Sequence, residues 1–233
     1  DRVEGVKFGI VGGVRHPQVD YSQVAESDAP WARSADQCMV YVSCHDNHTL
    51  YDKLKIANPQ ASQKEILKMH VLAQTIVLAS QGIPFLHAGV DFVRTKQGVE
   101  NSYNAPDSIN QIDWTRKDQF RDIFAFYRDL ISLRKQHPLF KLSTQEEIAR
   151  RLQFMDIPQV TVLAYTVDAS GLSDTWDQAL FIFNGGPSHE VVPVPDGVWT
   201  SVVEGKRIDD SGLRQFTKGS VGVPAHSGMI LYQ

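Results

Sequence analysis

Apolar residues follow two different patterns along the chain, and the pattern changes near residue 140. Before that point, short continuous apolar runs alternate with longer stretches in which apolar residues recur every three or four positions. Residues 39–42 and 83–86 are such runs, typical of strands buried on both faces, and a helix-like stretch follows each. This alternation of strand and helix predicts a parallel sheet covered by helices.

Local signals place the two helices of this first part. Ser62 and Glu65 have the spacing of a capping box, and apolar residues recur at helical intervals behind them. Thr115 and Asp118 have the same spacing and predict the start of a second helix. That helix should end before Pro138, because the residue that precedes a proline leaves the helical region.

The second part of the chain, from about residue 149, has short apolar stretches separated by glycine, proline and aspartate. Spacing of this kind predicts an antiparallel β-sandwich. We therefore predict two domains, residues 1–140 with α/β character and residues 141–233 as an all-β sandwich large enough for a small core of its own. The expected strands span residues 160–167, 179–183, 198–203 and 229–232.

The strand–helix part allows two architectures. A closed (β/α)₈ barrel takes about 250 residues, or roughly 31 for each unit. The first part contains only two units that the pattern identifies. Either these units belong to a barrel whose other strands are not in this chain, or they form a small open sheet. The pattern alone does not decide between the two.

Composition excludes several classes of partner. Apolar residues make up 42% and charged residues 21% of the 233 positions, as in ordinary globular domains. The 23 basic and 27 acidic residues give a net charge of −4, so we expect no binding to nucleic acid or to an anionic membrane, which both need a concentrated positive surface. No window approaches the roughly 18 apolar residues of a membrane span. The two cysteines are too few for a disulfide scaffold or a closed zinc site.

The densest polar cluster, residues 43–48, directly follows the first predicted strand. Barrels and open α/β sheets both place their sites at the carboxyl ends of parallel strands. The carboxylate of Asp46, flanked by the imidazole of His45 and the amide of Asn47, offers the acceptor and donors that vicinal sugar hydroxyls require. Two other interpretations stay open. Asp46 and Asn47 are loop residues that bond their own backbone, or His45, Asp46 and His48 bind a metal ion, although no further ligand is evident.

The cluster also resembles a known family. Residues 41–54 (YVSCHDNHTLYDKL) are similar to the last conserved region of the α-amylase superfamily of glycoside hydrolases, and in this long form to the type I pullulanases. Residues 92–96 (FVRTK) and 101–114 (NSYNAPDSINQIDW) resemble the pullulanase loop after the eighth barrel strand. Residues 6–12 (VKFGIVG) resemble the stretch that leads into the seventh unit. The resemblance covers residues 3–140 and implies that they form about the last two β/α units of a partial (β/α)₈ TIM barrel, with the family's β-sandwich after them.

The resemblance also implies a mechanism. Superfamily members cleave α-glucosidic bonds with retention, through an aspartate nucleophile and a glutamate general acid/base that lie on earlier strands. Asp46 takes the position of their third carboxylate, which stabilises the transition state, and His45 and Asn47 take those of sugar contacts. The loop after the second strand contributes further candidates for substrate binding, with packing on the barrel rim as the alternative: Arg94, Asn101 and Tyr103.

No acidic residue of the chain matches the nucleophile or general-acid motif, and a retaining mechanism needs two carboxyl groups about 5 Å apart. We therefore interpret the chain as the C-terminal part of a pullulanase-like α-1,6-debranching enzyme for pullulan, starch or glycogen-type glucans, and expect it to be inactive alone. Its expected partners are the α-glucan and either the missing N-terminal part of the barrel or a second copy, which would pair with the open strand edge.

No cofactor and no metal are expected. Two other functions stay open at this stage. One is a non-catalytic module that binds α-glucan, and the other is a metal-dependent hydrolase that uses His45, Asp46 and His48.

Overall fold

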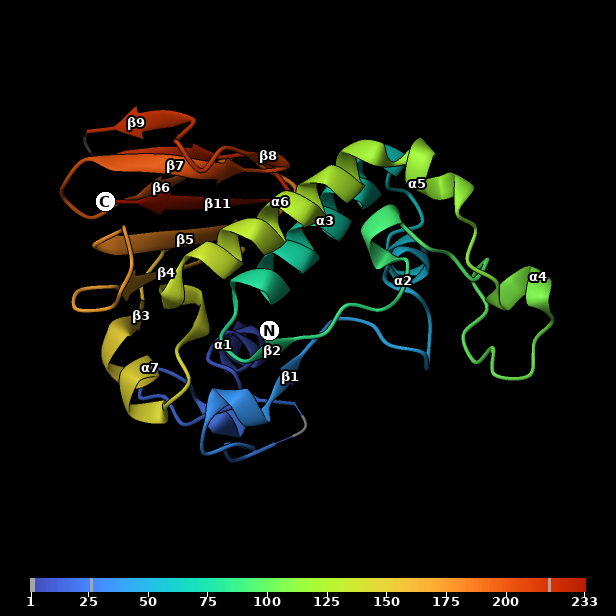
Figure 1. Ribbon diagram of the computed structural model, residues 1–233, viewed down its shortest axis with the longest axis horizontal. Helices are drawn as coiled ribbons and strands as arrows, with labels where there is room; N and C mark the ends of the chain where they lie inside the picture. Colours follow the sequence, from blue (N-terminus) through green and yellow to red (C-terminus); the bar gives the residue numbers. More distant parts are fainter. Residues whose placement is uncertain (1–2, 26, 218) are drawn as a thin grey trace.

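A pair of parallel strands and a long antiparallel sheet organise the chain (Figure 1). The computed structural model describes residues 3–25, 27–217 and 219–233. Strand β1 (Met39–Val40) pairs in parallel with β2 (Ile83–Pro84), and helices α2 (Leu50–Ala57) and α3 (Gln63–Ala79) lie between them in sequence. The predicted order of strand, helix and parallel strand is therefore confirmed.

The two predicted helices begin where they were predicted, but only the first has the predicted cap. Ser62 and Glu65 make the predicted capping box at the start of α3, with the Ser62 amide donating to the Glu65 carboxylate at 2.8 Å. The predicted cap at Thr115 is wrong, because its amide and hydroxyl both donate to Asp113 Oδ1, at 3.0 and 2.6 Å. Helix α5 (Thr115–Gln119) begins at Thr115. The helical conformation is interrupted at Phe120. Helix α6 (Arg121–Gln136) follows and ends before Pro138, as predicted.

The parallel strands are less buried than the sequence predicts. Met39 is 54% and Ile83 47% exposed, and Tyr41 and Val42 beyond β1 are exposed as well. Within the described part of the chain, β1 pairs with β2 alone, so its other edge has no strand partner there. The expectation of strands buried on both faces is therefore wrong for this chain, because burial depends on neighbouring elements as well as on the strand's own residues.

A seven-stranded antiparallel sheet fills the second part. Its order is β3-β4-β5-β11-β7-β8, with β9 also paired to β7, while β6 and β10 form a separate antiparallel pair. The four predicted strands correspond to β4, β5, β7 and β11. The strand bounds are β3 Leu152–Phe154, β4 Val162–Asp168, β5 Gln178–Asn184, β6 Glu190–Pro193, β7 Trp199–Glu204, β8 Arg207–Ile208, β9 Arg214–Phe216, β10 Ser220–Val223 and β11 Ser227–Tyr232.

The large sheet packs on a different layer at each face. Alternate residues of β5 point to opposite sides, because side chains in a strand alternate. Phe181 and Phe183 belong to the core that includes α3, and the Tyr165 hydroxyl donates to the carbonyl of Ala79 at 3.1 Å. Leu180 and its neighbours pack instead beneath β6 and β10. Helices, large sheet and small sheet thus form three successive layers.

Shorter elements complete the chain. None of the helices in the described ranges is long and apolar enough to cross a membrane. The remaining elements are α1 (Val3–Ile10), α4 (Asp107–Asn110), α7 (Gln145–Arg151) and the 3₁₀ turns η1 (Tyr21–Gln23), η2 (Ala35–Gln37), η3 (Val90–Phe92) and η4 (Pro138–Lys141).

Candidate functional site

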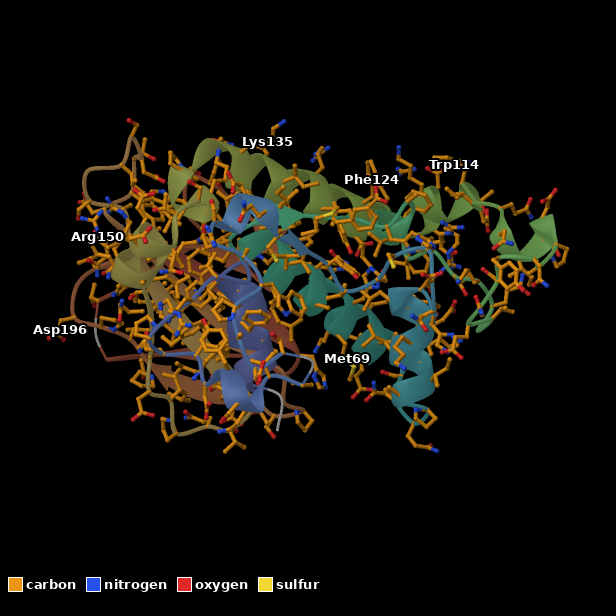
Figure 2. All side chains as sticks on the ribbon, turned by 90° about the horizontal axis from the view of Figure 1, so that it is seen from below. Met69, Trp114, Phe124, Lys135, Arg150 and Asp196 are labelled. Atoms are coloured by element: carbon orange, nitrogen blue, oxygen red, sulfur yellow. The ribbon has the colours of Figure 1, made fainter. Side chains whose placement is uncertain are left out.

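A polar pocket of about 250 Å³ lies where the loops that follow β1 and β2 meet. Its lining residue Asn110 belongs to α4, and this helix lies on the side of the molecule away from the large sheet (Figure 1). Figure 2 shows Trp114, just before α5, toward one end and Asp196 of the β-rich part toward the other. The pocket is lined by His45, Asp46, His87, Arg94, Lys96, Asn101, Ser102, Tyr103 and Asn110.

The loop after β1 brings Asp46 and His45 to the pocket. Their side chains are 66% and 84% exposed, and His45 Nδ1 lies 3.2 Å from Asp46 Oδ1. Asp46 has the one carboxylate among the described residues that line the pocket. Asn47 borders the site through its backbone, which adopts a left-handed conformation with φ of 60°. The loop therefore presents an accessible carboxylate beside an imidazole.

The metal-binding interpretation of this loop finds no support in its geometry. His48 is half-buried, and its Nδ1 has no hydrogen-bond partner among the described residues. Across residues 3–25, 27–217 and 219–233, no three His, Cys, Asp or Glu side chains gather closely enough to hold a metal ion. His45, Asp46 and His48 therefore do not form a ligand set.

The loop after β2 contributes Arg94, whose guanidinium is largely engaged by the protein. Its Nη1 donates to the carbonyl of Ala88 at 3.1 Å, and its Nη2 donates to the carbonyl of Asn110 at 2.8 Å. Nη1 also lies 3.4 Å from Nε2 of His87. Burial, followed by the positive charges of Arg94, Lys96 and His45, lowers the pKa of His87 to about 4. His87 is therefore neutral at neutral pH, and Arg94 chiefly shapes the wall of the pocket.

Asn101 and Tyr103 lie on the outer part of the same loop. The side-chain amide of Asn110 donates to the carbonyls of Ser102 and Ala105, at 2.7 and 3.0 Å, and so fixes the loop from inside. Tyr103 remains 84% exposed. An aromatic ring held open to solvent at the rim of a polar pocket is available for stacking on a ligand.

The structure brings five of the six predicted site residues together in this pocket and leaves Asn47 at its border. Four lining residues were not predicted: His87, Lys96, Ser102 and Asn110. The last three lie inside the segments that carry the family resemblance, and His87 lies at the end of the second predicted strand. The signal that could have identified these four residues was therefore their position in the sequence.

Comparison with known proteins places this architecture in a family. Residues 107–233 match the family described as "Alpha-1,6-glucosidases, pullulanase-type, C-terminal". The chain belongs to this pullulanase-type family. It is 39% identical to the pullulanase of Bacillus subtilis (strain 168) over 207 residues, which are 88% of this chain and 28% of the relative. It is 28% identical to the chloroplastic pullulanase 1 of Arabidopsis thaliana over 227 residues, 76% of this chain and 24% of the relative.

Solved pullulanase structures share the fold. The type I pullulanase of Bacillus subtilis str. 168 complexed with maltose matches with a TM-score of 0.87 and 34% identity, over 97% of this chain and 30% of that chain. The pullulanase of Paenibacillus barengoltzii in complex with maltohexaose and α-cyclodextrin matches with a TM-score of 0.82 and 37% identity, over 98% and 33%. The chain thus spans about a quarter to a third of the length of these pullulanases. The predicted relationship to type I pullulanases is confirmed.

Proposed function

We propose that the chain supplies part of the substrate site of a retaining, pullulanase-type glycoside hydrolase that cleaves α-1,6 bonds in pullulan, starch or glycogen-type glucans. One observation carries the proposal: Asp46 and His45, at the carboxyl end of β1, share a polar pocket with Asn101 and Tyr103 from the loop after β2. Two of the pullulanase structures that match the chain are complexed with maltose or with maltohexaose and α-cyclodextrin, which are α-glucans.

Each side chain of the pocket has a role in this proposal. Asp46 places a negative charge beside the sugar at the cleavage subsite, where the transition state of glycoside hydrolysis has oxocarbenium character. His45 and Asn47 contact sugar hydroxyls at the same subsite. In the second loop, the Asn101 amide binds hydroxyls and the Tyr103 ring stacks on a neighbouring glucose. Arg94 adds the guanidinium N–H donors that the carbonyls of Ala88 and Asn110 do not occupy.

The proposal extends to the architecture. Residues 1–140 are the last two β/α units of a (β/α)₈ barrel, and residues 141–233 are the C-terminal β-sandwich domain. The parallel pairing of β1 and β2 around α2 and α3 supports the first statement, since βα units in sequence build a barrel of parallel strands. The antiparallel sheets packed face to face support the second.

We further propose that the chain does not cleave glucans alone. A retaining mechanism needs two carboxyl groups about 5 Å apart astride the scissile bond. Among the described residues that line the pocket, Asp46 is the sole carboxylate, and its proposed role is that of neither member of the pair. A partner must therefore supply them. We propose the preceding part of the barrel or, failing that, a second copy of the chain.

Binding and turnover test the role of the pocket on the chain as it is. In calorimetry with maltohexaose, Asp46→Asn should weaken binding at least about tenfold, because a charge-assisted hydrogen bond to the sugar is lost. Asp107→Asn is the matched control, since Asp107 is exposed and lies outside the pocket lining. Neither the chain nor its variants should release reducing ends from pullulan. Pullulan cleavage that disappears with Asp46→Asn would show a complete site, and a chain that binds no glucan would contradict the proposed pocket.

A chimera tests the catalytic role. In it, this chain replaces the matching segment of the Bacillus subtilis pullulanase. The chimera should debranch pullulan, and Asp46→Asn should lower kcat by about 10²-fold or more, as loss of transition-state charge stabilisation does. Asp107→Asn should leave kcat unchanged. Normal turnover with Asp46→Asn would instead favour a non-catalytic glucan-binding module.

A further inference from the structure

We propose that Lys96 is a positioning residue that fixes the backbone on both sides of Asp46, an inference that rests on the proposed function of the pocket. Lys96 follows β2, yet its ammonium reaches the loop that follows β1. It donates to the carbonyl of Asn47 at 2.5 Å, to that of Glu100 at 3.0 Å and to that of His45 at 3.4 Å. The residue is 1% exposed, whereas buried lysines are rare in proteins unless they are paired.

The three carbonyls account for the whole donor capacity of the ammonium. A lysine ammonium has three N–H donors and no acceptor. Lys96 therefore keeps no donor for a substrate, although it lines the pocket. Its compact, rotatable ammonium suits carbonyls that approach from separate points of two loops, whereas the planar guanidinium of arginine suits flat, forked partners. These features point to a structural task at the site and away from direct contact with a glucan.

The positions of the carbonyls that accept from Lys96 indicate which part of the site it fixes. The His45 and Asn47 carbonyls lie immediately before and after Asp46 in the chain. The Asp46 carboxylate itself has the exposed His45 ring as its neighbour, and an exposed pair of this kind holds a side chain only weakly. Asn47 also adopts a left-handed backbone conformation, which is unfavourable for most residues and which asparagine tolerates better than most. The bond from Lys96 to the Asn47 carbonyl stabilises this turn and thereby sets the place of Asp46.

Lys96 is itself held by a third element. The carboxylate of Asp52, which is buried on α2, accepts from the backbone amide of Lys96 at 2.7 Å and from the hydroxyl of Thr95 at 2.5 Å. Asp52 thus anchors the second loop and places a negative charge near the buried ammonium. The Lys96 side chain therefore links the loops after β1 and β2, and Asp52 of α2 holds Lys96 in place.

Backbone dynamics test the proposal without any glucan. Lys96→Met keeps the length of the side chain but removes the ammonium. Backbone ¹⁵N order parameters of residues 45–49 should then fall, from about 0.85 to below about 0.6, while those of β5 and β11 stay unchanged. Lys53→Met, at an exposed lysine of α2, is the matched control and should change neither set. Unchanged order parameters at residues 45–49, or an equal fall throughout the molecule, would overturn the proposal.

A double-mutant cycle on maltohexaose affinity tests the link to Asp46. In the unmodified chain, Asp46→Asn should weaken binding about tenfold, whereas in the Lys96→Met background it should weaken binding less than twofold, because Asp46 is already displaced. Additive effects would overturn the positioning role. If the unmodified chain binds no glucan while Lys96→Met still frees residues 45–49, the proposed function fails and the structural role of Lys96 stands.

The unmodified chain provides a measurement that needs no folded variant. In NMR with labelled lysine, the Lys96 ammonium should exchange its protons slowly and show couplings across hydrogen bonds to the carbonyl carbons of Asn47 and Glu100. An ammonium that exchanges as fast as that of Lys53 would overturn the proposal even if Lys96→Met does not fold.

Discussion

The guanidinium of Arg134 donates to the carbonyl oxygen of Leu78 at 2.8 Å and so joins α6 to the last turn of α3. The same guanidinium donates to the carbonyls of Ser80 and Gly82, at 2.7 and 2.8 Å. Carbonyls at a helix C-terminus have no partner within the helix and attract positive charge. Burial lowers the pKa of Arg134 to about 10, so the group stays charged at neutral pH. One side chain therefore completes the end of α3 and fixes the turn into β2.

Replacement of this arginine should destabilise the chain. Arg134→Met leaves three carbonyls near the end of α3 without a donor, and the free energy of unfolding should fall by about 2 to 3 kcal/mol. Urea unfolding followed by circular dichroism measures the change. Arg128→Met is the control, because Arg128 on the same helix is exposed and pairs with Asp129. Its effect should stay within about 0.5 kcal/mol. Equal losses for the two variants would contradict this assignment.

Acid should destabilise the chain through His70. This side chain is fully buried against the carbonyl of Val90, and burial is the main cause that lowers its pKa to about 4 from the usual 6.5. Above pH 6.5 the histidine is neutral in both the folded and the unfolded chain, so its titration does not lower the free energy of unfolding there. Between pH 6.5 and 4 only the unfolded chain takes up the proton, and stability falls as the pH falls, by up to about 3 kcal/mol.

Two substitutions isolate this contribution. His70→Gln should flatten the dependence of unfolding free energy on pH between 6.5 and 4, whatever it does to stability at pH 7. His189→Gln, at an exposed histidine, should keep the slope of the unmodified chain. Burial also lowers the pKa of His16 and His87, so part of the slope should remain after His70→Gln. An unaltered slope in His70→Gln would exclude His70 as a source.

Gly89 and Gly98 form a matched pair for testing how the pocket wall is built. Both have left-handed φ angles, of 87° and 83°, which strain any other residue. A Cβ on Gly89 would lie 3.0 Å from the Cβ of Arg94, whereas no atom of the described residues lies within 4 Å of a Cβ on Gly98. Gly98→Ala should cost about 1 to 2 kcal/mol for the backbone alone. Gly89→Ala should cost about 1 kcal/mol more, since it also displaces Arg94. Equal free energies of unfolding for the two variants would show that the Arg94 side chain moves aside without cost.

The uncovered parallel strands should make the chain self-associate. Met39 and Ile83 are half-exposed apolar residues at neighbouring positions of β1 and β2, and open strand edges pair with other chains. The mass measured by light scattering should rise with concentration, and the double substitution Met39→Glu, Ile83→Glu should return it to that of a monomer. Val160→Glu is the control, at a valine that is 92% exposed outside the strands. A monomeric unmodified chain at high concentration would contradict this prediction.

The elements whose signal is local could be predicted from the sequence. Strands β4, β5, β7 and β11 carry continuous apolar runs, and the capping box of α3 lies within four residues. The strands that were not predicted are two to four residues long, and their formation depends on their partners. β3, β8 and β9 each pair with a longer strand, whereas β6 and β10 pair with each other. The burial of β1 was predicted wrongly for the same reason, since burial depends on which elements surround a strand.

The site residues also differ in whether a local sequence signal marks them. Asp46 and His45 were predictable because they directly follow a strand, where polar residues gather in α/β folds. The task of Lys96 was not predictable, because two of its partners are backbone carbonyls of residues 49 and 51 positions earlier in the chain, and carbonyls leave no mark in a sequence. Asn47 was predicted for its amide, yet the contribution that the structure records is its carbonyl oxygen.

The large sheet packs against α3 with one face and against β6 and β10 with the other, and this arrangement affects how the chain can be divided. A cut near residue 140 would leave Tyr165, Phe181 and Phe183 without their helical cover, so only one of the two cores that the large sheet forms would stay complete within the β-rich segment. The sequence predicts that this segment is large enough to fold independently, but its packing ties it to the helices. Limited proteolysis at residues 141–144 should therefore yield two pieces that remain associated and unfold in a single cooperative transition.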